Sequence, residues 1–512
     1  MKSFSILSIF ISFFLLTNSC QGTPGEKTVF IVQRNGRPLP AHEETKIVIP
    51  WSNVRKYFLN ADEFSFKVTE LNFGKEVAVH LIDVDKNHKP ESLVLNFTFT
   101  SNEPVYTFQI ESSKTKISFS SAKVEAVASV VITFLKPATQ LPPVQDWPAT
   151  IAGSTMSFYP DVTKLSINAP GQWNYECGFY LGGVMRLYEK TRDEKYYKYV
   201  RQWADHFIDA KGNMDTTQYN VAEYKLDDIL PGRLFLFLYA ITKEEKYRNA
   251  ADQLMDHLHH QPKTSEGGYW HKKIYPYQMW LDGIYMADVF TTQYAKQFNQ
   301  PALFDEAINQ ILLISKHTLD ANTGLMYHGW DESKNKTWAD QQTGTSPEFW
   351  GRAIGWYMMA LSECLDNIPA DHPQRKALIA VFQNLANSLL KYQDPESSLW
   401  YQVVNKGSER GNWIETSCSA MFAYAFAKGH HQGVLKKEFF DNASKVFGSI
   451  VNDYVYFDDE HRMYLTQTVK VGTLNPKSSK GDFAYYVSTE RRINDYKGLA
   501  PFLLLSLELS EK

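Results

Sequence analysis

Two hydrophobic patterns divide the chain. From about residue 27 to residue 135, apolar and polar positions alternate with a period of two in runs rich in β-branched residues, such as KIVIP, EFSFKVTE, KEVAVHLIDV and SLVLNFTFT. Alternation of this kind is typical of half-buried strands. Turn sequences such as RNGRP and KNHKPE separate seven or so runs, and the pattern predicts a small all-β sandwich over residues 27–135.

Between two of these runs, Asp83, Asp85 and Asn87 resemble the start of a calcium-binding loop. The glycine that such a loop needs for its sharp turn is missing, and no glutamate closes the loop at the right place. We therefore expect a plain hairpin turn.

A proline-rich segment, KPATQLPPVQDWP at residues 136–148, predicts a linker between two domains. Beyond it, over residues 149–512, the apolar positions follow a helical period. Stretches that begin at Leu187 and Leu238 share an apolar helix end, a short charged turn and a second amphipathic helix, and weaker echoes follow. Repeats of this length predict stacked helical hairpins.

Such hairpins build either an open solenoid or a closed double ring of helices, an (α/α) toroid. The repeats are irregular in length. The loops between them, EGGYW, NTGLMYHGWDE and ESSLWY, are rich in glycine and aromatic residues and suit the lining of one central cavity. We therefore predict a multidomain chain in which an all-α toroid follows the all-β sandwich.

The N-terminus predicts export. Lys2 precedes an apolar run from Ile6 to Leu16, and TNSCQG follows, which is typical of a signal peptide over residues 1–20. Cys20 at the predicted cleavage point suggests a bacterial lipoprotein, although Thr17 stands where leucine is more usual, so lipidation of Cys20 stays open. We expect a periplasmic protein or one tethered to the outer membrane through Cys20, with no other membrane insertion.

Composition narrows the function classes. The chain is 44% hydrophobic and 14% aromatic, which suits a large aromatic-rich core and also suits carbohydrate, since aromatic faces stack on sugar rings. Its net charge of −4, with no basic run, argues against a nucleic-acid partner. The cysteines beyond Cys20 are Cys177, Cys364 and Cys418, and their spacing fits neither a disulfide framework nor a metal site.

Four stretches combine polar and aromatic residues where loops meet helices: YKLDDILPGR with Asp227 and Asp228, QMWLDGIYMA with Asp282, LMYHGWDE with His328 and Asp331, and SPEFWGRAIGWY with Trp350, Arg352 and Trp356. Taken singly, most of these residues have an ordinary structural role as a helix cap, a hydrogen-bonded histidine or half of an ion pair. Asp282 differs, because a carboxylate inside an apolar run is rarely buried without a partner or a use.

On a toroid, these residues would converge at one mouth. A carboxyl group in an aromatic pocket near a second carboxylate has its protonated form favoured by desolvation and by repulsion, so that it can deliver a proton while its neighbour stays ionised. Motifs of serine nucleophiles, phosphate-binding loops and zinc proteases are absent from the sequence. Acid–base chemistry on a sugar is the surviving hypothesis.

The second domain resembles glycoside hydrolase family 105, the unsaturated rhamnogalacturonyl hydrolases. The resemblance runs from about residue 173 to 507 and rests on WNYECG, YKLDDILPGR, YQMWLDGIYMA, LMYHGWDE, FWGRAIGW, IETSCSAMFAYA and NDYKGLAPFLL, in matching order and spacing. It implies an (α/α)6 barrel without a metal or other cofactor. The implied substrates are lyase-generated oligosaccharides with a 4,5-unsaturated uronic acid at the non-reducing end. In the implied reaction, the enol ether is protonated at C4, water adds at C5, and the hemiketal collapses.

The resemblance also implies residue roles. Asp282 matches the general acid/base, kept protonated until it meets the alkene, and Asp227 matches a second carboxylate that contacts sugar hydroxyls and helps to keep Asp282 neutral. His328 matches a sugar-binding histidine. Arg352 is expected to face the substrate's carboxylate or hydroxyls, and Trp350 and Trp356 to wall the subsite. Asp228 and Asp331 are expected to be structural.

Three alternatives stay open. A family 88-like unsaturated glucuronyl hydrolase would act by the same chemistry on glycosaminoglycan fragments, although no basic cluster for sulfate accompanies the motifs. An inverting glycosidase acting on saturated sugars would need an acid and a base about 6.5–9.5 Å apart. A non-catalytic surface glycan-binding protein would tolerate loss of Asp282. The aglycone and the oligomeric state are left open as well.

Overall fold

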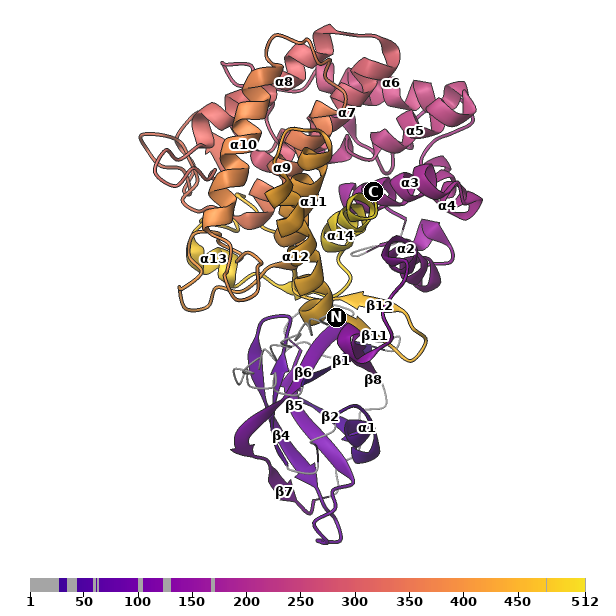
Figure 1. Cartoon of the computed structure of the whole chain (residues 1–512), viewed down its shortest axis with the longest axis vertical. Coiled ribbons are helices and arrows are strands. Elements are labelled where there is room, and N and C mark those ends of the chain that lie inside the picture. Colours follow the sequence, from indigo (N-terminus) through magenta and orange to yellow (C-terminus); the bar gives the residue numbers. More distant parts are fainter. Residues whose placement is uncertain are drawn as a thin grey trace, which may run out of the picture.

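The computed structural model describes residues 27–34, 44–58, 61, 64–99, 105–122, 130–166, 171–475 and 477–511. The chain folds into a strand-rich domain followed by a helical domain (Figure 1). The predicted signal over residues 1–20, with Cys20, lies outside the described residues and stays a prediction. None of the described helices combines the length and the apolarity that crossing a membrane requires.

The strand-rich domain is a twisted sheet, antiparallel except for one short strand. Its strands are β1 (Lys27–Arg34), β2 (Glu44–Pro50), β3 (Ser65–Glu70), β4 (Lys75–Ile82), β5 (Ser92–Thr98), β6 (Val105–Lys116), β7 (Ser118–Ser120) and β8 (Val130–Pro137), with a short helix α1 (Trp51–Tyr57) after β2. The hydrogen-bonded order is β8-β1-β6-β3-β4-β5-β2, and β7 pairs in parallel with β4. The predicted all-β domain is confirmed.

The sheet folds over on itself and encloses its own core. Phe97 of β5 lies edge-on to Phe108 of β6 at a ring-centroid distance of 5.1 Å, although two other strands separate β5 from β6 in the sheet. The segment with Asp83 and Asp85 joins β4 to its antiparallel neighbour β5, and the Asp83 carboxylate accepts from the backbone amides of Asn87 and His88. This is the expected hairpin turn.

The sheet continues into the helical domain. A hairpin of β11 (Val455–Phe457) and β12 (Met463–Leu465) adds to β8, where Tyr456 and Phe457 pair with Pro137 and Lys136. Lys136 and Pro137, assigned above to the linker, therefore end a strand. A proline is tolerated there because it closes the strand, where no further ladder bond is needed from it.

The described part of the helical domain contains two concentric rings of six helices. The inner ring is α3 (Tyr175–Thr191), α5 (Gly232–Thr242), α7 (Leu281–Phe298), α9 (Gly351–Leu365), α11 (Thr416–His431) and α14 (Tyr496–Leu509); the outer ring is α2 (Trp147–Phe158), α4 (Glu194–Asp205), α6 (Glu245–His259), α8 (Ala302–Thr318), α10 (Arg375–Lys391) and α12 (Lys437–Tyr454). Because α14 packs against α3, the inner ring is closed (Figure 1). The predicted toroid is an (α/α)6 barrel.

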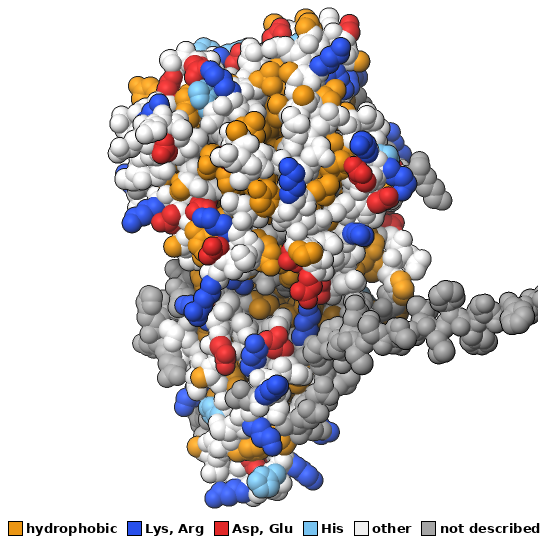
Figure 2. Space-filling model, turned by 60° about the vertical axis from the view of Figure 1, so that its left-hand side comes forward, with side chains coloured by type: hydrophobic (Ala, Val, Ile, Leu, Met, Phe, Trp, Pro, Cys, Tyr) orange, Lys and Arg blue, Asp and Glu red, His pale blue; other side chains and the backbone are white. Residues whose placement is uncertain are grey.

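The sequence pattern explains which helices face the axis. Every residue of α9 is buried, as expected of a helix with neighbours on all sides. On α12 only the stripe of Phe439, Ala443, Val446 and Ile450 is buried, because its other face meets water. On the face drawn in Figure 2, acidic and basic side chains are interspersed over the helical domain, in keeping with the small net charge.

The repeated hairpins turn in the same way. Helices α3, α5 and α7 each end at a residue in the left-handed conformation, Arg192, Lys243 and Asn299. Such a residue lets its own amide bond back to a free carbonyl at the end of the helix and sends the chain outward. Each of these three inner helices thus runs away from one mouth of the barrel, and the outer helix that follows returns to it.

One buried carboxylate of the barrel wall has no visible partner. Asp288 of α7 is 1% exposed, and neither of its carboxylate oxygens has a hydrogen-bond partner among the described residues. Burial, with a smaller contribution from the charge of Glu306, holds the pKa of Asp288 well above its ordinary value. The folded chain therefore keeps a proton that the unfolded chain releases, and the free energy of unfolding falls as the pH rises above the unfolded pKa.

We predict that Asp288→Asn stabilises the protein, because it removes this ionisable group while keeping its shape. The gain should be about 1–3 kcal/mol near neutral pH and should shrink near pH ~4, where the unfolded carboxyl is protonated too. Urea denaturation at both pH values measures it. Asp256→Asn, at a side chain that is 71% exposed, is the matched control and should show neither effect. Equal pH dependence in wild type and Asp288→Asn would contradict the account.

Candidate functional site

A cavity of about 320 Å³ opens at the N-terminal ends of the inner helices. Five of the six predicted site residues line it, namely Asp227, Asp282, Trp350, Arg352 and Trp356. The sixth, His328, lies behind Asp282, with its Nε2 3.1 Å from Asp282 Oδ2. Segments from four separate stretches of sequence thus meet at one mouth, as the toroid predicts.

A small β-ribbon brings Asp282 and His328 together. Strand β9 (Gln278–Trp280) leads directly into α7 and pairs with β10 (Gly329–Asp331), which follows His328. The backbone amide of Leu281 donates to the His328 carbonyl over 2.9 Å. Asp282 therefore stands in the first turn of α7 with the imidazole of His328 fixed beside it.

His328 is held from its other side. Its ring is fully buried, and its Nδ1 shares a hydrogen bond of 2.7 Å with the Tyr486 hydroxyl. When that hydroxyl donates, Nε2 carries the ring proton and faces the carboxylate of Asp282. The 14% exposed side chain of Asp282 therefore has a polar neighbour, so its surroundings are less apolar than the flanking sequence suggested.

Asp227 has a different environment. It lies in a short 3-10 turn, Leu226–Asp228, and its Oδ2 is 2.5 Å from Lys272 Nζ, while its Oδ1 is 3.6 Å from His271 Nε2. Burial alone would raise the pKa of Asp227, but the charge of the Lys272 ammonium and its hydrogen bond to Asp227 outweigh burial and lower that pKa. Asp227 is therefore an ionised carboxylate, locked to an ammonium group.

His271 and Lys272 are site residues that the motifs did not single out. Burial lowers the pKa of His271 to about 4, so its imidazole is neutral, and the ring stacks on Trp280 at 4.4 Å. The sequence predicts that the loop EGGYW lines the cavity, and HKK follows it directly. Gly283 permits the fit, since a Cβ there would lie 3.2 Å from His271 Nδ1.

Aromatic rings build the walls and the floor of the cavity. Trp280 stacks on the rings of both His271 and Tyr275. Trp350 stacks on Tyr486, and its Nε1 donates to Gln402 over 3.2 Å. Trp356 packs deeper, against Phe179 and Tyr285. Trp350 and Trp356 are each 1% exposed, so only narrow parts of their faces reach the cavity.

Arg352 lines the cavity but is largely engaged by the protein. Its Nε donates to Ser417 Oγ over 2.5 Å, and its Nη2 donates to the Val469 carbonyl over 2.8 Å and lies 3.7 Å from Glu415. Two of its three nitrogens therefore have protein acceptors. Arg352 thus has fewer N–H donors available for a ligand than a free arginine side chain would have.

The fold gathers further charges that no local motif displays. Lys470, Arg492, Lys497 and Glu176 also line the cavity. Lys497 pairs with Glu176 and lies 3.0 Å from Asp495, while Lys470 lies 3.1 Å from Glu490. The sequence shows no basic cluster near the motifs because these residues come from distant segments. In the folded chain, each of these lysines faces a carboxylate.

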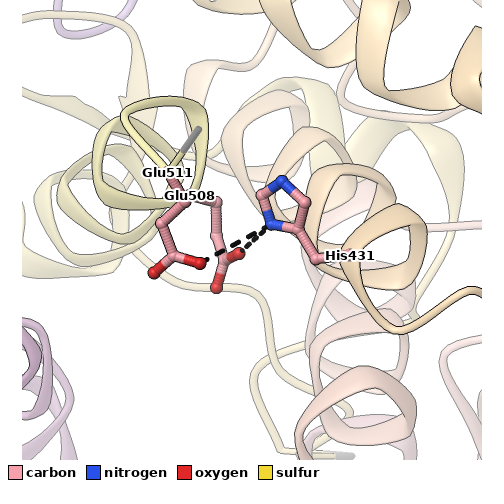
Figure 3. Close-up of side chains that lie close together, drawn as sticks. All are labelled: His431, Glu508 and Glu511. Atoms are coloured by element: carbon pink, nitrogen blue, oxygen red, sulfur yellow. Dashed lines mark hydrogen bonds and ion pairs between the residues drawn. The ribbon is translucent and has the colours of Figure 1, made fainter.

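Two groups within the described residues have carboxylates close enough together for a metal ion. One group is Asp83, Asp85 and Glu91 in the segment between β4 and β5, and the carboxylate oxygens of all three accept hydrogen bonds from backbone amides. In the other, His431 of α11 points at Glu508 and Glu511 at the end of α14 (Figure 3). Lys428 lies 3.7 Å from Glu508 and already supplies positive charge. Neither group lines the cavity.

Comparison with known proteins identifies the family. Residues 147–512 match the family model described as Glycosyl Hydrolase Family 88. The chain belongs to this family. As a member of it, the protein is a glycosidase, and the alternative of a non-catalytic glycan-binding protein is set aside.

Individual relatives of this family 88 glycosidase agree with the predicted resemblance. A solved family 105 glycoside hydrolase from C. acetobutylicum ATCC 824 is 36% identical, with a TM-score of 0.69, over 72% of this chain and 100% of its own. Protein Atu3128 of Agrobacterium fabrum is 30% identical over 226 residues, 43% of this chain and 96% of its own length. The unsaturated rhamnogalacturonyl hydrolase YesR of Bacillus subtilis is 25% identical over 270 residues, 52% of this chain and 73% of its own length. The resemblance to family 105 is confirmed.

We predict that Lys272→Met destabilises this glycosidase near neutral pH, because it leaves the buried, ionised Asp227 without its partner. The cost should be roughly 3 kcal/mol. The lowered folded pKa of Asp227 makes the pair stabilising above the unfolded pKa, and this stabilisation is lost as the pH falls. The difference between variant and wild type should therefore shrink in acid.

Urea denaturation of Lys272→Met, Asp227→Asn and the double variant measures this coupling. The double variant should be more stable than Lys272→Met alone, because it removes the orphaned charge. If the two substitutions are simply additive, Lys272 does not hold Asp227 in the way described.

Proposed function

We propose that this enzyme releases a 4,5-unsaturated uronic acid from the non-reducing end of lyase-generated oligosaccharides by protonating and hydrating the C4=C5 bond. The observation that carries the proposal is that two carboxylates in one cavity have different partners. Asp227 is ionised and locked to Lys272, whereas Asp282 stands beside His328 without a counter-cation of its own among its described contacts.

This difference suits alkene hydration better than ordinary inversion. An inverting glycosidase needs one carboxylic acid and one free carboxylate that activates water. Asp227 is a poor water-activating base, because the charge and the hydrogen bond of Lys272 lower its pKa. One acid that later serves as the base is sufficient for hydration of an enol ether, and Asp282 is the remaining candidate.

The proposed steps follow from enol-ether chemistry. Asp282 transfers its proton to C4, and the positive charge that develops at C5 is shared with the ring oxygen. The Asp282 carboxylate then takes a proton from a water molecule as that water's oxygen bonds to C5. The resulting hemiketal opens to a C5 ketone, and the hemiacetal exposed at C1 releases the aglycone as an alcohol.

The surroundings support this sequence. The hydrogen-bonded His328 and Tyr486 fix the position from which Asp282 delivers and recovers its proton. The inner helices direct their N-termini toward the cavity, and their dipoles favour the carboxylate of a uronic acid. His328, Arg352, Trp350 and Trp356 are proposed to position the terminal sugar, with Arg352 acting through the donors that the protein leaves available.

Pectic rhamnogalacturonan is the proposed source of the substrate. The cavity lysines face carboxylates, which leaves little positive charge for a sulfate group and supports an uncharged neighbour such as rhamnose. The relationship to YesR, whose name specifies rhamnogalacturonyl substrates, points the same way. Unsaturated glucuronyl fragments of glycosaminoglycans are the second candidate. The cationic side chains of Lys272, Lys470, Arg492 and Lys497 line the cavity, and a sulfated sugar would contact them in spite of the carboxylates nearby.

Loss of the ultraviolet absorbance of the conjugated double bond tests the proposal. Wild type should consume an unsaturated rhamnogalacturonan disaccharide faster than an unsaturated chondroitin disaccharide. Asp282→Asn should lower kcat by about 10²–10⁴-fold, since an amide cannot supply the proton. Asp305→Asn, at a side chain that is 64% exposed on the outer helix α8, is the matched control and should keep wild-type rates.

A preference for the chondroitin disaccharide would replace the pectic substrate while keeping the chemistry. Cleavage of saturated oligosaccharides, with neither unsaturated disaccharide consumed, would overturn the proposed function.

A further inference from the structure

The strand-rich domain reaches the neighbourhood of the catalytic cavity through one turn. Between β3 and β4, the carbonyl of Asn72 accepts from the backbone amide of Arg491 over 2.8 Å. Asn72 is 3% exposed, and its Oδ1 accepts from the Thr107 amide of β6 over 2.9 Å. The turn is therefore fixed to the middle of the sheet, and Arg491 is bonded to a rigid support.

The side chain of Arg491 is clamped between the two domains. Its guanidinium lies 4.5 Å from the ring centroid of Trp413, in the helical domain. In the strand-rich domain, a Cβ at Gly74 would lie 3.1 Å from both terminal nitrogens of Arg491, so only glycine allows this approach without displacing the guanidinium. Because Gly74 also has a φ of +70°, it serves both the turn and the contact.

From Arg491, one route leads to Arg352 of the cavity. Arg491 and Arg492 form β14, which pairs with β13 (Thr468–Val469), and Arg491 stands opposite Val469. Val469 donates its amide to Glu415 over 2.9 Å and accepts from Arg352 Nη2 over 2.8 Å. The position of β14 thus sets the position of the acceptor that orients Arg352.

A second route leads to Asp282. Arg491 packs on the indole ring of Trp413. The backbone carbonyl of Trp413 accepts a hydrogen bond from the backbone amide of Gln402. The side chain of Gln402 accepts from Trp350 Nε1 and donates to the carbonyl of Tyr486 over 3.1 Å. Tyr486 in turn bonds His328, the neighbour of Asp282.

We propose that the strand-rich domain is part of the catalytic apparatus, and that Arg491 is a positioning residue through which its β3–β4 turn aligns Arg352, Tyr486 and His328. The proposal rests on the proposed function of the cavity. Arg491 is one of several contacts between the domains, since β8 pairs with β11 and a separate cluster joins Asp459 to Lys56 and Tyr57. Unlike the residues of those contacts, Arg491 is connected by hydrogen bonds and packing to Arg352 and to the neighbours of Asp282.

The test compares two full-length variants that each remove one contact between the domains. Arg491→Met removes the guanidinium that contacts Trp413 and approaches Gly74, and it keeps the backbone bond to Asn72. Asp459→Asn, which removes the charge that faces Lys56, is the matched control at the attachment that does not lead to the cavity. Hydrogen exchange at Val469 and Lys470, whose amides bond Glu415 and Glu490, reports on the site without any substrate. Kinetics on an unsaturated disaccharide and the melting temperature complete the comparison.

Arg491→Met should speed exchange at Val469 and Lys470 and lower kcat by about 10–100-fold, as expected for misplaced catalytic groups. Asp459→Asn should do neither, and its melting temperature should change little, because the side chain of Asp459 is 51% exposed and such ion pairs contribute little to stability. Arg491→Lys should recover part of kcat, because an ammonium group also lies favourably over an indole ring.

If Arg491→Met and Asp459→Asn have the same exchange at these amides, the positioning role is wrong whatever the substrate. If wild type consumes no unsaturated disaccharide while exchange still separates the two variants, the proposed function fails and the coupling between the domains stands.

Discussion

Desolvation at the mouth of the barrel decides which charged side chains this structure can hold there. The closed ring of inner helices removes the charged groups of the cavity from most of the solvent, and a buried charge is costly unless another charge or a hydrogen bond compensates it. The site accordingly consists of compensated charges: Asp227 with Lys272, Glu176 with Lys497, and Arg352 beside Glu415. Asp282 stands apart, since its close polar neighbour is a histidine that is itself held by a tyrosine.

This distribution of charge gives the two carboxylates of one barrel mouth different surroundings, as the proposed function requires. The ammonium of Lys272 keeps Asp227 ionised, which suits a group that accepts hydrogen bonds from sugar hydroxyls. The position of Asp282 at the start of α7 is set by a two-stranded ribbon rather than by a flexible loop. A proton donor on a rigid element can be placed accurately against one carbon of a substrate. The barrel thus largely buries both carboxylates, pairs Asp227 with Lys272 and fixes the position of Asp282.

Much of the fold follows from local pattern, and the predicted residues of the site do meet. The period-two runs became strands, and repeated hairpins became concentric rings, because the apolar stripe of a helix such as α12 can be read from spacing alone. The partners of those residues could not be read in this way. Lys272 and Asp227 lie on different hairpins, and Arg491 meets Asn72 and Gly74 only because two domains come together, so no spacing along the chain predicts these contacts. Likewise, the sequence suggests that the guanidinium of Arg352 is free to bind a ligand, whereas two of its nitrogens donate to Ser417 and to the Val469 carbonyl.

The most direct test of the account is the fate of C4 when wild type acts on an unsaturated disaccharide in D₂O. Transfer of a proton from Asp282, which exchanges with solvent, to one face of the alkene predicts that the product sampled early carries a single deuteron at C4, in one stereochemical position, by NMR. A released uronic acid that retains its double bond, or that carries deuterium equally on both faces of C4, would contradict protonation by Asp282.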